Sequence, residues 1–404
     1  MKKVLYISYD GMTDPLGQSQ VIPYLIGLSK AGHQIVLMSF EKEQRFLKGA
    51  SAISELLTAN NIRWKPIIYT KNPPIISTII DLSKMKNTAM KLHDIHHFDI
   101  VHSRSYIAAL AGLYLKQKTG IKFIFDMRGF WADERVEGGL WNLKSPIYNR
   151  IYLYFKQKEK EFLKEADYII SLTNAGKKEL ERMVGNAHLL NIKVIPCCVD
   201  TNLFNRINID QNKFDNYKTK LNIKEDDFVI SYLGAIGTWY MLDEMLSFFQ
   251  RLLIHKPNSK FLFITNEADE TIYSKADEKG IPRESISIIS ANRVDVPILL
   301  SLSQINLFFI KPSYSKTASS PTKLAEVMSM GIPVISNKGV GDVDEIINET
   351  GVLVSSFTDE EFDKTIAAIP QLLSISPDFI RQKAIELFSL EKGIRSYREV
   401  YEEF

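Results

Sequence analysis

Residues 319–326, SSPTKLAE, bring hydroxyl groups, a proline, a lysine and a glutamate together within about two helical turns. Pro321 and its hydroxyl neighbours are typical of a helix start, whose free N–H groups and positive dipole bind phosphate. Lys323 adds a positive charge there, and the carboxylate of Glu326, one turn later, can accept both hydroxyl groups of a ribose. An ordinary capped helix is the alternative. The residues of this predicted nucleotide site are Ser320, Thr322, Lys323 and Glu326.

A second group of functional side chains lies at residues 126–134, DMRGFWADE, directly after an apolar strand pattern. Carboxylates bind the hydroxyl groups of sugars, a guanidinium suits phosphate, and an indole ring can stack on the face of a sugar. We therefore predict an acceptor site here. The ligands assigned to it are Arg128, Trp131 and Glu134, and Asp126 and Arg128 are also predicted to be catalytic.

Two further segments end strands of the same half of the chain. Residues 10–20, DGMTDPLGQSQ, form a polar loop in which Gly17 permits close approach of the backbone to a donor phosphate. Asp10 opens this loop and is assigned to the acceptor. A plain strand-to-helix loop is the alternative. Arg104 ends the strand DIVHSR and is predicted to bind acceptor and to act in catalysis, whereas His102 is more often structural at such a position.

The elements that must position these residues alternate between strand and helix. Expected strands in the first half lie at 2–8, 34–40, 63–69, 99–103, 122–127, 167–173 and 193–199, with helices at 19–33, 53–61, 78–93, 107–118, 145–165 and 175–184. After a polar, loop-like stretch at 200–227, strands are expected at 228–234, 260–265, 285–290, 305–310 and 333–336, with helices at 241–255, 269–279, 295–303, 322–330 and 342–348. Apolar strands separated by helices predict an α/β protein with parallel sheets covered on both faces.

We predict two Rossmann-like domains facing a central cleft, because such sheets bind ligands beyond the carboxyl ends of their strands. The expected divisions are a first domain at 1–200, a second domain at 201–385 and a last helix at 386–404. In that helix, Tyr397 and Tyr401 share one face.

Composition narrows the class of protein. Hydrophobic residues make up 45% and charged residues 24% of the chain, the balance of a soluble globular protein. Net charge is +2, with a basic excess before residue 200 that suggests an anionic partner such as phosphate or a lipid surface, or merely a solvated face. The only cysteines, Cys197 and Cys198, cannot build a disulfide framework, and no apolar run is long enough for a membrane span. We expect a cytoplasmic protein, at most peripheral on the inner membrane face, with no nucleic-acid partner.

Several segments resemble the GT-B glycosyltransferases of family four, the retaining group 1 enzymes. Residues 305–346, which contain the SSPTKLAE turn, resemble the donor-binding segment of that family, and VIPCCVDTNLF at 194–204 resembles its interdomain signature. The resemblance spans essentially the whole chain. It implies that the domain at 1–200 binds the acceptor, that the domain at 201–385 binds the nucleotide sugar, and that the last helix at 386–404 packs back on the first domain. It implies a UDP- or GDP-linked sugar as donor, with no cofactor and no metal. Enzymes of this fold use cationic side chains and helix dipoles in place of a metal ion. It also implies that Arg104 stands where the family often has a histidine that contacts the transferred sugar.

The sequence departs from the family pattern at two places. Glu326 matches the second glutamate of the usual pair, but Ala318 stands at the first position, so the chain resembles an SPTK variant. In YLGAIGTWY, Ala235 follows Gly234 where the family has an arginine, and no lysine is near. The cation for the leaving diphosphate must therefore lie elsewhere. The candidates are Lys323, Arg293 and Lys311, and the glycines expected at the donor are Gly234 and Gly237.

Asp342 and Asp344 resemble the metal motif of the other large glycosyltransferase fold, but Asp342 is better placed to cap the next helix. We predict a metal-independent, retaining glycosyltransferase that moves a sugar to a glycan or lipid-linked saccharide, in bacterial surface polysaccharide or glycoconjugate synthesis. The alternatives are a nonhydrolysing sugar-nucleotide 2-epimerase of the same fold and a two-lobed sugar-binding protein without catalysis. The segment 143–166 interleaves aromatic residues with lysines, so it is either an interfacial helix or an ordinary helix with a basic outer face.

Overall fold

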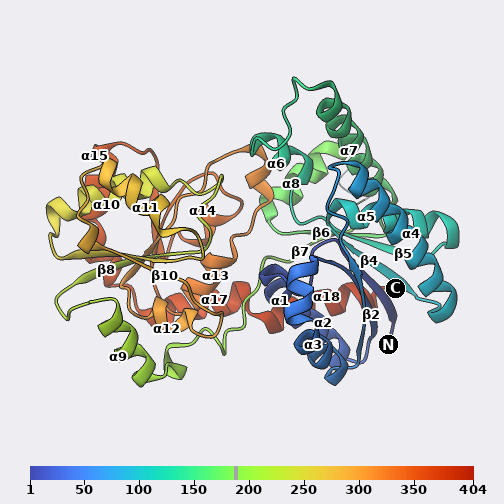
Figure 1. The fold of residues 1–404 in the computed structure, drawn as a ribbon, viewed down its shortest axis with the longest axis horizontal. Helices are drawn as coiled ribbons and strands as arrows, with labels where there is room; N and C mark the ends of the chain where they lie inside the picture. Colours follow the sequence, from blue (N-terminus) through green and yellow to red (C-terminus); the bar gives the residue numbers. More distant parts are fainter. Residues whose placement is uncertain (186–189) are drawn as a thin grey trace. The chain divides into compact units, whose positions relative to one another are not determined.

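The computed structural model describes residues 1–185 and 190–404 and divides into two compact units (Figure 1). The first unit comprises Met1–Cys197, Thr317–Ser319 and Leu390–Phe404. The second unit comprises Cys198–Lys316 and Ser320–Ser389. The last helix of the chain therefore belongs to the unit in which the chain begins.

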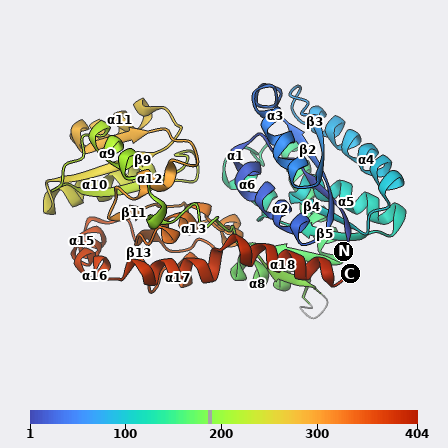
Figure 2. The same cartoon turned by 90° about the horizontal axis from the view of Figure 1, so that it is seen from below.

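The first unit is built on a seven-stranded sheet in the order β3-β2-β1-β4-β5-β6-β7, in which every pairing is parallel. Its strands are β1 (Lys3–Ser8), β2 (Gln34–Glu41), β3 (Ile62–Ile68), β4 (Ile100–Arg104), β5 (Lys122–Asp126), β6 (Tyr168–Ser171) and β7 (Ile192–Val194). Its helices are α1 (Pro15–Gln20), α2 (Ile22–Lys30), α3 (Glu43–Ala59), α4 (Ile76–His96), α5 (Ser105–Thr119), α6 (Trp131–Glu137), α7 (Pro146–Glu165), α8 (Asn174–Val184) and α18 (Leu390–Glu402). Helix α5 packs between α4 and α7, and α18 packs on α2 (Figure 1, Figure 2).

The second unit is built on a six-stranded parallel sheet in the order β10-β9-β8-β11-β12-β13. Its strands are β8 (Phe228–Leu233), β9 (Ser259–Ile264), β10 (Ile286–Ile289), β11 (Ile305–Leu307), β12 (Val334–Asn337) and β13 (Gly351–Val354). Its helices are α9 (Gln211–Lys220), α10 (Leu242–His255), α11 (Asp269–Glu278), α12 (Val296–Leu300), α13 (Thr322–Ser329), α14 (Val343–Ile346), α15 (Asp359–Ala367), α16 (Ile369–Leu373) and α17 (Pro377–Phe388), with 3-10 turns η2 (Arg206–Asn208), η3 (Arg283–Ser285) and η4 (Tyr314–Ala318).

The expected α/β class with two Rossmann-like domains is confirmed, and the differences lie in single elements. The helix expected at 19–33 is divided into α1 and α2 at Val21, because Pro23 sits in the first turn of α2 and cannot donate a backbone hydrogen bond to the turn before it. The polar stretch 200–227, expected to be a loop, contains α9. That helix exposes most of its residues, so its sequence carries only a weak apolar period.

Each sheet has one point at which the strand order reverses, between β1 and β4 in the first unit and between β8 and β11 in the second. Loops that leave neighbouring strands at such a point diverge to opposite faces of the sheet, and the crevice between them is where open parallel sheets bind ligands. The fold thus places one candidate site at the carboxyl edge of each sheet.

Candidate functional site

In the first unit, Asp10 and Arg104 meet at the point where the strand order reverses. Arg104 is the last residue of β4 and is only 3% exposed, and its Nε lies 3.6 Å from Oδ2 of the half-exposed Asp10. Within the described part of the chain, Nε and Nη1 of Arg104 have no hydrogen-bond partner. Buried donors without partners cost free energy and mark places where a ligand or water completes the bonding. Arg104 therefore has the geometry of a binding residue.

Asp126 and His102 lie side by side on the neighbouring strands β5 and β4 and connect them to the last helix. Oδ2 of Asp126 accepts a hydrogen bond from the Tyr397 hydroxyl at 3.0 Å and lies 3.4 Å from Nε2 of His102. Nδ1 of His102 lies 2.8 Å from the Tyr401 hydroxyl. A neutral imidazole with its proton on Nε2 satisfies both contacts. The two tyrosines of α18 therefore connect the last helix to β4 and β5. Their i, i+4 spacing in the sequence indicated only that they share one face of the helix.

Burial disfavours the charged forms of both His102 and Asp126, but only His102 is neutral as a result. Burial lowers the pKa of His102, although Asp126 acts in the other direction. Burial also disfavours ionised Asp126, but Arg128 and His102 outweigh it and lower the pKa of this carboxyl to about 2. At neutral pH, therefore, the site holds a neutral histidine beside a carboxylate.

These shifts predict that the free energy of unfolding falls as pH is lowered. As pH falls below about 6.5, His102 becomes protonated in the unfolded chain before it does in the folded chain. Below about pH 4 the same holds for Asp126, which is also protonated more readily in the unfolded chain. Urea unfolding measured from pH 7.5 to 5 should give a smaller pH slope for His102→Asn than for the wild type. The exposed His97→Asn serves as the control and should leave the slope unchanged. Equal slopes for His102→Asn and the wild type would contradict the buried neutral histidine.

Arg128 follows β5 in a strained conformation. Its φ is +60°, its Nη1 lies 3.7 Å from Oδ1 of Asp126, and its Nη2 donates to Sγ of Cys197 at 3.3 Å. Non-glycine residues with positive φ cost free energy and persist where the surroundings enforce them, often at functional sites. The contact with Asp126 holds a second guanidinium at the same sheet edge as Arg104.

Trp131 and Glu134 lie on the short helix α6 beyond this edge. Trp131 packs in an aromatic cluster: its ring stacks on Tyr106 at 5.9 Å and meets Trp141 and Phe155 edge-on, and Arg135 covers it at 5.0 Å. Its partial exposure leaves only part of the ring accessible. Contact of Trp131 and the partly buried Glu134 with a sugar stays a prediction.

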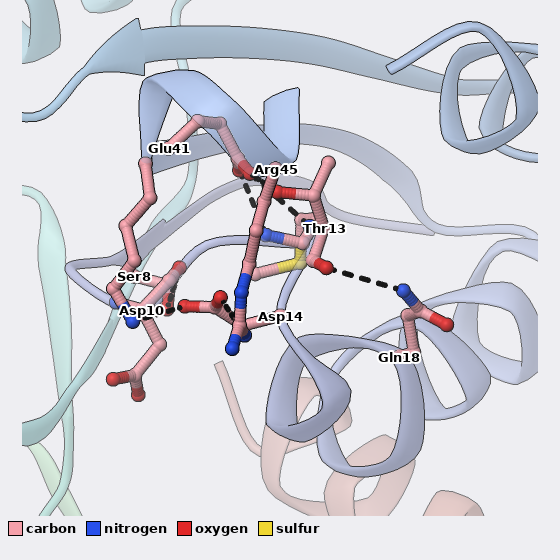
Figure 3. A network of polar contacts seen from close by, with 9 residues as sticks. Ser8, Asp10, Thr13, Asp14, Gln18, Glu41 and Arg45 are labelled. Carbon is pink, nitrogen blue, oxygen red and sulfur yellow. Dashed lines mark hydrogen bonds and ion pairs between the residues drawn. The ribbon is translucent and has the colours of Figure 1, made fainter. Parts of the chain in front are cut away.

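The loop after β1 is held by a residue that the sequence analysis missed (Figure 3). Glu41, the last residue of β2, is fully buried, and its carboxylate accepts the N–H groups of Met12 at 2.7 Å and Thr13 at 3.1 Å. It also accepts the hydroxyls of Thr13 at 2.7 Å and Ser39 at 2.6 Å. These loop amides are thus bonded to the protein's own carboxylate. The one feature of the sequence that could have indicated this role is that Glu41 ends an otherwise apolar strand.

Gly17 lies in helix α1 against the same loop. A Cβ atom at Gly17 would lie 2.2 Å from the carbonyl oxygen of Gly11, so only glycine fits where α1 packs on the loop. This close packing accounts for Gly17 without a ligand. Its assignment to the donor stays a prediction.

In the second unit, Lys323 lies beneath the loop that follows β8. Its Nζ donates to the Tyr232 hydroxyl at 2.9 Å and lies 3.7 Å from the centre of the Tyr240 ring. Gly234, at φ +114°, is so close that a Cβ there would lie 3.3 Å from Nζ. Burial lowers the pKa of Lys323 well below its usual range, although Glu326 acts in the other direction. Burial therefore disfavours the charged form of the Lys323 amine.

Glu326 lies one turn further along α13 and pairs with Arg293. Nη1 of Arg293 donates to Oε1 of Glu326 at 2.7 Å, and the guanidinium lies 5.2 Å from the centre of the Phe204 ring. Burial raises the pKa of Glu326, and Arg293 opposes this. The structure thus brings together Lys323, Glu326 and Arg293, which the sequence placed in the donor site.

The start of α13 differs in detail from the expectation. Thr322 is the first helical residue and Pro321 the residue before it, so Pro321 does not occupy the first turn, and for this helix no side-chain cap hydrogen bond is found. Ser320 and Thr322 are both partly buried beside this helix start. Pro321, at the N-cap position, has no side-chain acceptor for the N–H groups of the first turn.

Other lysines and glycines of the second unit occupy different environments. Lys311 and Gly237 are exposed, and the N–H of Lys311 donates to the carbonyl of Trp239. Lys316, which the sequence analysis did not single out, is buried with its Nζ 3.8 Å from the centre of the Trp239 ring. Buried Lys316 is a better candidate than exposed Lys311 for the cation beside a bound diphosphate. The sequence signal for Lys316 was its position in the polar segment just before Lys323.

Within residues 1–185 and 190–404, no three His, Cys, Asp or Glu side chains are grouped so as to hold a metal ion. Asp344 accepts the N–H of Gly339 at 3.1 Å, and Asp342 precedes α14 without a side-chain cap hydrogen bond to it. In the same described ranges, no helix has the length and apolar character required to cross a bilayer.

Comparison with known proteins places these sites in a family. Residues 21–203 match the model of Glycosyltransferase Family 4, and residues 213–374 match the model of Glycosyl transferases group 1. The second match contains Lys323, Glu326 and Arg293. A search of curated proteins gives no significant match.

Solved structures share the fold at low sequence identity. A glycosyltransferase from Rickettsia africae ESF-5 aligns with a TM-score of 0.72 and 16% identity over 100% of this chain and 98% of its own. HepE of Anabaena, in complex with UDP and glucose, aligns with a TM-score of 0.71 and 15% identity over 100% of both chains. Sucrose-phosphate synthase from Thermosynechococcus elongatus aligns with a TM-score of 0.74 and 15% identity over 100% of this chain and 99% of its own. These likenesses show the GT-B fold, and the two family matches show that the chain belongs to the glycosyltransferases of family four and group 1.

Proposed function

We propose that the protein is a retaining, metal-independent glycosyltransferase that moves a sugar from a UDP- or GDP-linked donor to a glycan or lipid-linked saccharide. The observation that carries the proposal is the buried pair Lys323 and Glu326 in the first turns of α13, within the segment that matches the group 1 model. The complex of the structural neighbour HepE with UDP and glucose supports a nucleotide-linked donor. Synthesis of bacterial surface polysaccharide or another glycoconjugate is the proposed setting.

In the proposed donor site, the diphosphate lies against Gly234 and the first turn of α13, and Glu326 accepts the ribose hydroxyls through the oxygen that Arg293 leaves free. The bond between the anomeric carbon and the β-phosphate oxygen breaks as the acceptor oxygen attacks on the same face. The acceptor proton passes to the departing phosphate oxygen. Lys323 and the helix dipole stabilise the negative charge that develops there.

In the proposed acceptor site, Arg104 and Arg128 supply the cations, with Asp10, Trp131 and Glu134 around them. The unsatisfied N–H groups of Arg104 suit an anionic or polyhydroxylated group, because each new hydrogen bond there relieves a buried donor. A 2-epimerase of the same fold would need no such acceptor cluster, and this cluster favours transfer.

Donor hydrolysis and transfer can be measured together. The protein would be incubated with UDP- and GDP-linked sugars, with and without lipid-linked saccharide extracts, and free nucleoside diphosphate would be quantified. We expect release that depends on the acceptor and on one base. An epimerised sugar nucleotide formed without acceptor would favour the 2-epimerase, and no release with any donor and acceptor pair would contradict the proposal.

Glu326→Ala is expected to raise the donor KM by about 10- to 100-fold, the range for losing a hydrogen bond to a charged group. The reason is that the carboxylate binds the ribose, whereas the reacting bond lies beyond it at the diphosphate. Steady-state kinetics with varied donor would give KM and kcat separately.

Arg293→Ala is the matched control, because Glu326 also holds that guanidinium. If Glu326 acts only by placing Arg293, both single variants and the double variant will show the same KM. If Glu326 binds ribose, the donor KM of Glu326→Ala will be higher than that of Arg293→Ala. An unchanged donor KM in Glu326→Ala would remove Glu326 from the donor site.

A further inference from the structure

A single arginine of the second unit connects two segments that lie far apart in the sequence. Arg381 is in the second turn of α17, a helix that packs on α13 (Figure 1, Figure 2). Its Nη1 donates to the carbonyl oxygen of Phe204 at 2.6 Å and also to that of Ser329. Its Nη2 donates to the carbonyl oxygen of Thr201 at 2.8 Å. The guanidinium thus joins the segment 201–204 to the last residue of α13.

These hydrogen bonds of Arg381 all go to backbone carbonyl oxygens. The residue is partly buried, and burial lowers its pKa, although the charge of the exposed Asp378 acts in the other direction. A guanidinium presents its N–H groups in a rigid, planar fork. Bonds from one such fork to two segments therefore fix the position of one backbone relative to the other.

The two segments that Arg381 joins support Glu326 from two directions. Ser329 follows Glu326 by three residues, about one helical turn, on α13. Phe204 is fully buried, and the centre of its ring lies 5.2 Å from the guanidinium of Arg293. That guanidinium donates to Oε1 of Glu326 at 2.7 Å. Arg381 is thus bonded both to the helix that carries Glu326 and to the residue beneath its ion-pair partner.

The end of α13 is also packed closely against the start of α17. Gly331 has a φ of +67°, and a Cβ atom there would lie 2.6 Å from the carbonyl oxygen of Pro377, the first residue of α17. Only glycine permits so close an approach of the two backbones. With the bond from Arg381 to Ser329, this contact holds the end of α13 against the first two turns of α17.

We propose that Arg381 is a positioning residue for the nucleotide sugar, because it holds the Arg293–Glu326 pair in the geometry that binds the ribose. This role rests on the proposed function, in which Glu326 accepts the ribose hydroxyls. Lys323 does not depend on these bonds, since it lies in the first turn of α13 and its amine is bonded to Tyr232 of β8. Loss of Arg381 should therefore weaken donor binding more than it slows the chemical step.

Arg381→Met is expected to raise the donor KM by about 5- to 30-fold and to change kcat and the acceptor KM by less than about twofold. Methionine keeps most of the apolar stem and removes the guanidinium. Steady-state kinetics with each substrate varied in turn separate the three constants. Lys383→Met is the matched control, because this lysine is on the same helix and pairs with the exposed Glu349. The control should keep the wild-type donor KM.

A double variant shows whether Arg381 acts through Glu326. In a Glu326→Ala background, Arg381→Met should raise the donor KM by less than about twofold further, because the carboxylate that it positions is absent. Independent effects of the two substitutions would overturn the proposal, as would an unchanged donor KM in Arg381→Met alone. A wild-type donor KM in Glu326→Ala would instead reject the ribose role of Glu326, and the positioning role with it.

Urea unfolding without substrate tests the same connection independently of activity. If Phe204 links Arg381 to Arg293, the effects of Arg381→Met and Arg293→Ala on the unfolding equilibrium constant should not multiply. We expect the double variant to fall short of the product of the two single effects by at least about threefold. Effects that multiply fully would overturn the proposed connection, whatever the kinetics.

Arg381→Lys provides a second kinetic test if Arg381→Met does not fold. Lysine keeps the positive charge near the end of α13, which the helix dipole favours. It lacks the planar fork that reaches both segments. The donor KM should therefore still rise, by a smaller factor than in Arg381→Met, and a wild-type donor KM in a folded Arg381→Lys would overturn the proposal.

Discussion

Lys323→Met is expected to lower kcat by roughly 100- to 1000-fold while the donor KM changes by less than about tenfold. The amine lies against Gly234, where the leaving diphosphate is proposed to gain charge, and that charge favours the protonated form of the amine. An interaction that strengthens as charge develops acts on the transition state and so lowers kcat when removed. Methionine matches the lysine side chain as far as Cε and keeps apolar packing against Tyr232 and Tyr240, so the loss reports the amine group.

The environment of Lys323 adds a pH signature to this prediction. Burial lowers the pKa of the amine well below its usual range, so the free enzyme holds it partly or wholly neutral as pH rises. A bound diphosphate raises that pKa, because an adjacent anion favours the charged form. Donor binding should therefore take up a proton, and affinity should fall as pH increases through the pKa of the free enzyme. Lys323→Met should lack this pH dependence, which isothermal titration in buffers of different ionisation enthalpy measures.

Two other lysines provide the comparison. Lys311→Met removes an exposed cation and should leave kcat within about twofold, as surface substitutions usually do. Lys316→Met removes the buried cation stacked on Trp239 and tests whether this second amine shares the role. If Lys323→Met keeps its kcat while Lys316→Met loses it, the leaving-group cation is Lys316 and the assignment of Lys323 fails.

The sequence indicated the elements better than the contacts between them. SSPTKLAE predicted a helix start with Lys323 and Glu326 on successive turns, because those spacings are local. It did not indicate the aromatic rings around Lys323, since Tyr232 of β8 and Tyr240 in the segment after that strand lie far earlier in the chain. The bonds of Asp126 to Tyr397 and of Glu41 to Met12 were out of reach for the same reason. Such partners depend on strand order, which a single sequence does not specify.

Glu41→Leu is expected to lower the free energy of unfolding by about 3 to 5 kcal/mol, because it leaves several buried donors without an acceptor. The carboxylate is fully buried and accepts from both backbone N–H groups and both hydroxyls that surround it. A leucine fills similar volume, so the loss reports hydrogen bonding and not a cavity. Urea unfolding at neutral pH gives the difference directly.

The same carboxylate has a positioning role that a stability measurement alone would miss. It fixes Met12 and Thr13, the second of which is labelled in Figure 3. The same loop carries Asp10, whose Oδ2 lies 3.6 Å from Nε of Arg104. Glu41→Gln keeps one acceptor oxygen but turns an NH2 group toward donors, so we expect part of the stability loss and a raised acceptor KM with an unchanged donor KM. Glu43→Gln, an exposed neighbour in α3, should change neither. If Glu41→Gln lowers stability but leaves the acceptor KM unaltered, Glu41 stabilises the loop only for folding. Asp10 would then not depend on Glu41 for its position relative to the acceptor.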